Sequence, residues 1–128
     1  MIELMEGVED IPGTALYEGI EWGEWETYPE YLDYLGKREY TLDVGGLIPH
    51  SAVRNYVMGE RALRHEDATP EDLAAMCKIV EEGLNAGAIG FSTSRTIGHR
   101  SVLGEPIPGT FAEKEELMAV RNKRVEKE

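Results

Sequence analysis

The stretch between residues 69 and 93 constrains the fold of this 128-residue chain more than any other part. Thr69 has the side chain of a helix N-cap, and Pro70 takes the first helical position, where its missing N–H is not needed. Apolar residues then recur at spacings of three and four, which predicts a helix over residues 70–86 with one buried face. These residues are Leu73, Met76, Cys77, Val80 and Leu84. Gly87 is placed to end this helix.

A short strand is predicted directly after this helix, over residues 88–93, Ala-Ile-Gly-Phe-Ser-Thr. A helix, one glycine and a short strand form the pattern of an α/β unit with a parallel sheet. A second strand is predicted over residues 40–47, which lack helix formers after Leu42 and contain the pair Gly45 and Gly46. The predicted fold class is therefore α/β.

Shorter elements are predicted on both sides of this unit. Thr27 and Glu30 have the spacing of a capping box, with Pro29 near the helix start, and the predicted helix ends at Gly36. Residues 110–113, Thr-Phe-Ala-Glu, have the same spacing and predict the start of another helix. The remaining predictions are a helix tail over residues 1–7, a chain break at Pro49 and His50, a helix over residues 51–58, a polar loop over residues 60–68 and a long loop over residues 94–109.

Charge is unevenly distributed along the chain. The net charge is -12, and residues 1–36 contain ten Asp or Glu but no Lys or Arg. Nucleic-acid binding needs basic residues that neutralise phosphates, so no nucleic-acid partner is expected. The acidic stretch is either a solvated surface or a surface that docks a basic partner.

The single cysteine excludes an intramolecular disulfide and favours a cytoplasmic setting. No apolar run approaches the ~20 residues of a membrane-spanning helix, so no membrane partner is expected. The N-terminal residues also lack the pattern of a signal peptide.

Several segments occur in an order that is itself informative. They are Leu-Met-Glu-Gly-Val-Glu-Asp-Ile-Pro-Gly at residues 4–13, Trp-Glu-Thr-Tyr-Pro-Glu-Tyr-Leu at 25–32, Val-Gly-Gly-Leu-Ile-Pro-His at 44–50, Arg-Asn-Tyr-Val-Met-Gly at 54–59, Ala-Thr-Pro-Glu-Asp at 68–72, Ala-Gly-Ala-Ile-Gly-Phe-Ser-Thr-Ser-Arg-Thr at 86–96, His-Arg-Ser at 99–101, Pro-Gly-Thr at 108–110 and Glu-Glu-Leu at 115–117. Together they resemble the N-acyl-D-amino-acid deacylase (D-aminoacylase) branch of the metal-dependent amidohydrolase superfamily. The most specific segment is residues 86–96.

The resemblance implies that residues 1–120 are an internal fragment of a catalytic (β/α)8 TIM barrel, with about two barrel strands and their flanking helices. A complete barrel of this type takes ~250 residues. Residues 121–128 form a charged C-terminal tail that does not match the family. The isolated fragment would leave barrel edges exposed, through which self-association is expected.

Enzymes of this family hydrolyse the amide bond of N-acyl-D-amino acids with zinc held by histidines, a bridging acidic or thiolate ligand and an aspartate. None of these ligand positions has a counterpart in this chain. The resemblance therefore implies zinc and an N-acyl amino acid substrate for the longer parent protein. For this chain alone it implies no cofactor, no catalytic residue and no activity.

The candidate site residues follow the two predicted strands, where a barrel places its active site. They are His50, Ser94, Arg95, Thr96, His99 and Arg100. His50 either supports the substrate site or bonds the loop backbone after Pro49. Arg95 or Arg100 has the planar donor set that grips a carboxylate, unless the arginine pairs with an acidic neighbour such as Glu105.

Other reactive or aromatic residues have simpler interpretations. His65 is predicted to be a surface histidine, and Cys77 a packed core residue. The three histidines of the chain match no compact metal motif, and the aromatic residues between 17 and 34 are predicted to pack together. The functional alternative to an enzyme fragment is a non-catalytic acidic α/β module that binds a protein.

Overall fold

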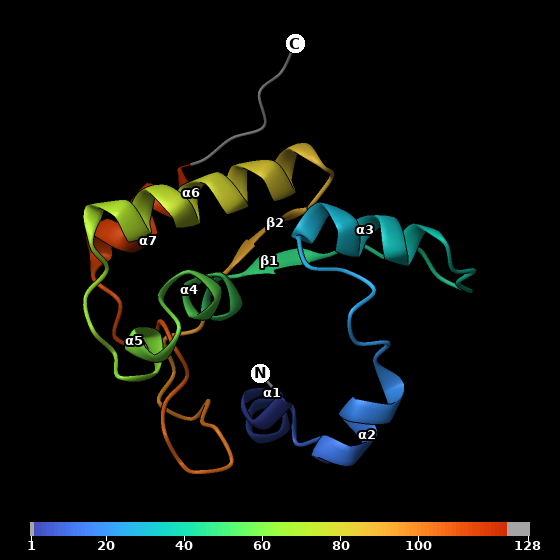
Figure 1. The fold of residues 1–128 in the computed structure, drawn as a ribbon, viewed down its shortest axis with the longest axis horizontal. Coiled ribbons are helices and arrows are strands. Elements are labelled where there is room, and N and C mark those ends of the chain that lie inside the picture. The colour runs from blue at the N-terminus through green and yellow to red at the C-terminus, as the bar shows by residue number, and fades with distance from the viewer. Residues whose placement is uncertain (1, 123–128) are drawn as a thin grey trace.

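Seven helices and two strands follow one another in residues 2–122, the part of the chain that the computed structural model describes (Figure 1). They are α1 (Ile2–Glu9), α2 (Gly13–Gly19), α3 (Tyr28–Gly36), β1 (Leu47–Pro49), α4 (His50–Met58), α5 (Glu60–Leu63), α6 (Pro70–Asn85), β2 (Gly90–Ser92) and α7 (Lys114–Arg121). The fold is thus of the mixed α/β class. None of these helices is long and apolar enough to cross a membrane.

The two strands are parallel neighbours in one sheet. Leu47 pairs with Gly90, Ile48 with Phe91 and Pro49 with Ser92. Parallel strands need a crossover connection, and α4, α5 and α6 supply it. In Figure 1, α6 lies along the strands, and it contacts α3, α4 and α7.

The core lies where α6 covers β1. It contains the buried residues Ile48, Val53, Met76, Val80, Ala88 and Val120. Gly83 lets α6 approach the strand closely, because a Cβ at this position would lie 2.7 Å from the Cδ1 atom of Ile48. Helix α6 and strand β1 therefore come close together at Gly83, where no side chain separates them.

The caps predicted for α6 and α3 are confirmed. In α6, the Thr69 hydroxyl accepts a hydrogen bond from the Asp72 N–H at 3.2 Å, and the Asp72 carboxylate accepts one from the Thr69 N–H at 2.8 Å. Gly87 follows the helix with φ +114°, a conformation that favours glycine. The capping box of Thr27 and Glu30 also starts α3 as predicted.

The predicted strand over residues 40–47 is wrong in its placement. Residues 40–46 are not a strand, and Leu42 is 79% exposed, so apolar character there does not reflect burial in a sheet. Pairing begins only where Gly46 O accepts a hydrogen bond from Ile89 N at 3.0 Å. The predicted strand over residues 88–93 is confirmed as the shorter β2.

Three further predictions need correction. The Thr110 hydroxyl donates to Ile107 O at 2.8 Å, so Thr110 does not cap α7, whose N-cap is Glu113. His50 begins α4, so the expected break ends at Pro49, and the predicted polar loop over residues 60–68 contains the short helix α5.

The predicted helix over residues 51–58 is confirmed, and the predicted tail over residues 1–7 corresponds to α1. The short helix α2 was not predicted.

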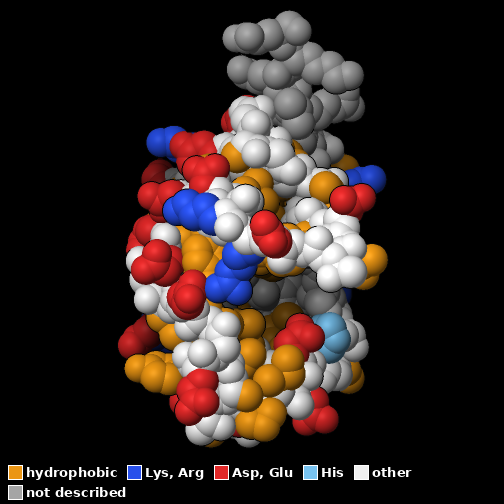
Figure 2. All heavy atoms as spheres, turned by 90° about the vertical axis from the view of Figure 1, so that its right-hand side faces the viewer, with side chains coloured by type: hydrophobic (Ala, Val, Ile, Leu, Met, Phe, Trp, Pro, Cys, Tyr) orange, Lys and Arg blue, Asp and Glu red, His pale blue; other side chains and the backbone are white. Residues whose placement is uncertain are grey.

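The C-terminal tail predicted over residues 121–128 falls mostly beyond the described residues. Arg121 is the last residue of α7 and Asn122 is its C-cap, whereas residues 123–128 lie outside the described range. Figure 2 shows the face that carries α3 and α2, where acidic side chains are scattered among exposed apolar ones. Acidic and apolar groups therefore share this face.

Candidate functional site

The carboxyl ends of β1 and β2 meet at one edge of the sheet because the strands are parallel. His50 follows β1 directly and Thr93 follows β2 directly. The Nδ1 atom of His50 lies 3.1 Å from the Thr93 hydroxyl oxygen, which joins the two strand ends. The His50 side chain is only 1% exposed, whereas Thr93 is exposed to solvent.

A buried carboxylate lies behind His50. The Nε2 atom of His50 is 2.7 Å from Oε1 of Glu116, and Arg54 Nε donates to the same oxygen at 2.9 Å. A carboxylate only accepts hydrogen bonds, so His50 Nε2 carries a proton and, in a neutral ring, Nδ1 accepts from the Thr93 hydroxyl. Arg54 also donates to Glu66 O at 2.6 Å, which links α4 to the loop before α6.

These partners stabilise the ionised form of Glu116. Burial acts to raise the pKa of Glu116, but the hydrogen bond from His50 and the charge and hydrogen bond of Arg54 outweigh it. The pKa of Glu116 therefore lies below its ordinary value, and the side chain is ionised at neutral pH. This ion cluster of His50, Arg54 and Glu116 fastens α4 to α7.

Backbone packs closely against the His50 ring. Gly109 has φ +94°, and a Cβ there would lie 2.8 Å from His50 Nδ1. Phe91 of β2 places its ring centroid 5.5 Å from that of His50. His50 is thus enclosed, and among its polar contacts only Thr93 is exposed to solvent.

The loop after β2 is organised by its own polar groups. Ser94 Oγ lies 2.9 Å from Nδ1 of His99, and His99 N donates to Thr96 O at 3.3 Å. The Arg100 side chain donates to Gly104 O at 2.6 Å, and its backbone forms an antiparallel β-bridge with Pro106. Arg100 therefore does not form the ion pair with Glu105 that the sequence left open. Within residues 2–122, Arg95 is exposed and makes no hydrogen bond or ion pair.

The far side of this loop rests on α1. Val102 N donates to Glu3 O at 3.4 Å, and a Cβ at Gly7 would collide with Arg100 O. The loop after β2 is thereby held against α1 at residues 100–102. The six predicted site residues thus fall into a buried one, His50, and an outer group, with Ser94, Arg95, Thr96, His99 and Arg100 on the loop.

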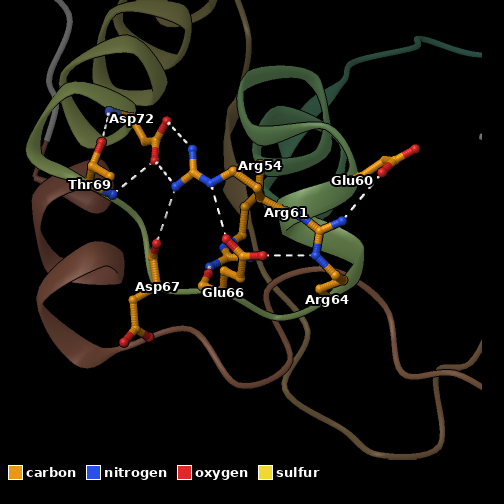
Figure 3. Close-up of polar contacts among 8 residues, drawn as sticks. All are labelled: Arg54, Glu60, Arg61, Arg64, Glu66, Asp67, Thr69 and Asp72. Atoms are coloured by element: carbon orange, nitrogen blue, oxygen red, sulfur yellow. Dashed lines mark hydrogen bonds and ion pairs between the residues drawn. The ribbon is translucent and has the colours of Figure 1, made fainter.

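An ion-pair network next to the site ties α5 to α6 (Figure 3). Arg61 donates to Asp72 at 2.7 Å and to Glu66 at 3.3 Å, and Arg64 donates to Glu66 at 2.8 Å. The hydrogen bond from Arg61 contributes most to lowering the pKa of Asp72. This network fixes the loop whose Glu66 carbonyl holds Arg54.

Other predicted roles have mixed outcomes. His65, predicted to lie on the surface, is half-buried against Phe111 with the ring centroids 5.1 Å apart, and both ring nitrogens are buried without a hydrogen-bond partner in the described structure. Cys77 packs against the core as predicted, and Trp25 packs against Tyr31 and Tyr34. No group of three or more His, Cys, Asp or Glu residues in the described range is arranged to hold a metal ion.

Sequence reasoning missed Arg54 and Glu116 as members of the site. Both belong to segments that were noted only for their resemblance. Arg54 lies one helical turn after His50, so a histidine and an arginine spaced by four residues on a short helix could have suggested a shared buried partner. Nothing local marks Glu116 as that partner.

The chain is similar to much longer proteins. D-aminoacylase from Alcaligenes xylosoxydans xylosoxydans is 35% identical over 69 residues, which cover 54% of this chain and 14% of that enzyme. Uncharacterized proteins of Mycobacterium tuberculosis and Mycobacterium bovis are each 27% identical over 133 aligned residues, covering 95% of this chain and 22% of the relative. The chain thus spans less than a quarter of these relatives. No protein-family model matches it, and no solved structure matches it significantly.

Proposed function

We propose that this chain is part of the catalytic (β/α)8 barrel of a zinc-dependent amidohydrolase that cleaves the amide bond of N-acyl-D-amino acids. The observation that carries the proposal is the 35% identity to D-aminoacylase over 69 residues. The geometry agrees with it, because the two parallel strands are joined by a helical crossover whose helix α6 packs against β1. The candidate residues also follow the carboxyl ends of the strands, where barrel enzymes build their active sites.

The zinc ligands of this proposed enzyme belong to the rest of the parent protein. Both ring nitrogens of His50 are already occupied, by Thr93 and Glu116, and no other metal-ligating group is assembled in residues 2–122. These residues therefore do not fit a zinc site by themselves. The role proposed for this chain is to form part of the barrel wall and to present the substrate loop over residues 94–100.

Arg95 is the proposed contact for the substrate carboxylate. Its guanidinium group is exposed and without a polar partner among the described residues, whereas Arg100 is engaged by the carbonyl of Gly104. A guanidinium group binds a carboxylate through two parallel hydrogen bonds. The buried His50 supports this contact indirectly, because it holds Thr93 at the start of the loop.

The test uses the full-length parent protein with zinc, assayed on an N-acetyl-D-amino acid and on its carboxamide analogue. Arg95→Ala should lower kcat/KM on the acid by about ten- to a hundred-fold, the equivalent of losing a charge-assisted contact of roughly 1.5–3 kcal/mol. The same variant should change kcat/KM on the carboxamide much less. Arg100→Ala is the matched control, in which no such selectivity is expected.

Two outcomes would contradict different parts of the proposal. Equal losses on both substrates would show that Arg95 does not bind the carboxylate. No turnover of any N-acyl-D-amino acid by the zinc-loaded parent would reject the enzymatic function. The non-catalytic acidic module would then become the better explanation of residues 1–36.

A further inference from the structure

The hydrogen bonds that connect Glu116, His50 and Thr93 form a relay with a fixed direction. The Glu116 carboxylate accepts from His50 Nε2 at 2.7 Å, so that nitrogen carries a proton. Arg54 donates to the same carboxylate at 2.9 Å, and its positive charge already balances the negative charge of Glu116. All three side chains of this cluster are at most 3% exposed, and a second positive charge on His50 would be buried without a counter-charge. The imidazole ring is therefore neutral, and its Nδ1 atom has a lone pair and no proton.

The direction of the relay determines what the Thr93 hydroxyl can offer to a ligand. Nδ1 of His50 lies 3.1 Å from the hydroxyl oxygen and can only accept, so the hydroxyl directs its one proton inward. A hydroxyl group has one proton to donate and two lone pairs, and only the lone pairs remain for other partners. Thr93 is exposed and follows β2 directly. The end of this strand therefore presents an oxygen that accepts hydrogen bonds and does not donate them.

An oxygen of this kind discriminates between the polar groups of a substrate. Apart from its side chain, an N-acyl amino acid has an ionised carboxylate and an acyl carbonyl, which are acceptors, and an amide N–H, which is a donor. The two acceptors would face the Thr93 oxygen lone pair to lone pair, whereas the amide N–H is complementary to it. Arg95, the proposed contact for the carboxylate, is two residues away, and the carboxylate and the amide nitrogen are attached to the same carbon of the substrate.

We propose that Thr93 accepts a hydrogen bond from the N–H of the scissile amide, and that Thr93 and Arg95 together orient the substrate. This inference rests on the proposed function, and it names a residue that distinguishes amides from esters. In an ester analogue, an oxygen atom that cannot donate replaces the N–H. His50 and Glu116 are positioning residues for this contact, because they hold the Thr93 proton inward.

Substrate selectivity of the zinc-loaded parent protein tests the contact. The two substrates are an N-acetyl-D-amino acid and the 2-acetoxy acid with the same configuration and side chain. Thr93→Val removes the oxygen and nearly keeps the shape, so it should lower kcat/KM on the amide by about three- to tenfold and change that on the ester much less. Thr93→Ser keeps the hydroxyl and should retain the ratio of the two values. An ester that is bound but not cleaved is compared through its inhibition constant.

The direction of the relay is tested in this chain without any hydrolysis. At neutral pH, the ¹⁵N NMR signals of His50 should be those of a ring with a proton on Nε2 and none on Nδ1. The signals of His50 are those that persist in both His65→Gln and His99→Gln. A proton on Nδ1 would leave the Thr93 hydroxyl free to donate outward and would overturn the proposal.

The kinetic outcomes separate this inference from the function on which it rests. An active parent in which Thr93→Val affects amide and ester equally, or affects neither, would overturn the Thr93 contact alone. A parent that cleaves neither substrate would reject the enzymatic function and the substrate contact together. Loss of selectivity in Thr93→Val, with selectivity kept in Thr93→Ser, is the result that supports the proposal.

Discussion

Glu116 is ionised although only 3% of its side chain is exposed, so removing its carboxylate should destabilise the fold strongly. Glu116→Ala would leave the Arg54 guanidinium buried without its carboxylate. Breaking a buried pair in this way costs about 3–5 kcal/mol of unfolding free energy. Glu115→Ala, on an exposed position of the same helix, should change stability by no more than about 0.5 kcal/mol. Urea denaturation of the two variants measures the difference, and equal stabilities would show that the cluster does not hold α4 to α7.

The same residue gives the stability of the chain a defined dependence on pH. The pKa of Glu116 is lower in the folded chain than in the unfolded chain, where it is about 4.3. Its contribution is therefore complete above about pH 4.3 and is lost as the pH falls through the lower folded pKa. Between about pH 5 and about pH 3, Glu116→Gln should lose less stability than the wild type. Parallel pH profiles of the unfolding free energy would contradict this assignment.

At the level of residues, the sequence allowed only one of the three members of the cluster, His50, to be predicted. His50 was recognised as a candidate because it follows a strand, and the structure places it at that strand end. Its partner Glu116 is 66 residues away, and no local pattern in a single sequence links two such positions. The same holds for His65, whose burial depends on the distant ring of Phe111.

At the level of elements, the N-terminus of α6 is stabilised by a cap that the sequence predicts. Thr69→Ala removes the hydroxyl that accepts from the Asp72 N–H and should cost about 0.5–2 kcal/mol. Asp72 keeps its ion pair with Arg61, so the variant isolates the cap. Thr41→Ala, on an exposed residue outside any helix or strand, is the control and should have no comparable effect. A denaturation midpoint that is the same for both variants would mean that the cap does not stabilise α6.

The capped helices α3 and α6 were predicted well, whereas the position of β1, which distant pairing fixes, was not. The helices α3 and α6 carry capping residues within one turn of their start, so a short window of sequence suffices. The position of β1 depends on pairing with β2, more than 40 residues away in the chain. A local signal can also mislead. The spacing of Thr110 and Glu113 predicts a helix cap, but the Thr110 hydroxyl donates to Ile107 O instead.

At the level of the whole molecule, the proposed function implies that the isolated chain does not hydrolyse N-acetyl-D-amino acids, even with zinc added. The reason is that the proposed metal ligands lie in other parts of the parent protein. The measurement is product formation by the purified chain with and without zinc, compared with buffer alone. Turnover above the buffer rate that a chelator abolishes would mean that the chain carries an active site of its own.

In the described sheet β1 pairs only with β2, and we expect the isolated chain to associate with itself through the other edge of β1. Exposed apolar side chains at the sheet favour pairing of the edge, whereas a net charge of -12 on each chain opposes it. Salt screens this repulsion, because the Debye length falls from about 10 Å at 0.1 M to about 3 Å at 1 M. In sedimentation velocity, the mean mass should therefore rise above the monomer mass of 14.3 kDa as protein or salt concentration increases.

A lysine at the edge should suppress this association, because edge charges prevent strand pairing. Leu47→Lys should keep the chain monomeric under conditions in which the wild type associates. Leu103→Lys is the matched control, because Leu103 is 78% exposed but lies in the loop after β2 and not on the sheet edge. If both lysine variants reduce association equally, general charge repulsion is responsible, and if the wild type stays monomeric in high salt, the open edge of β1 is not an association surface.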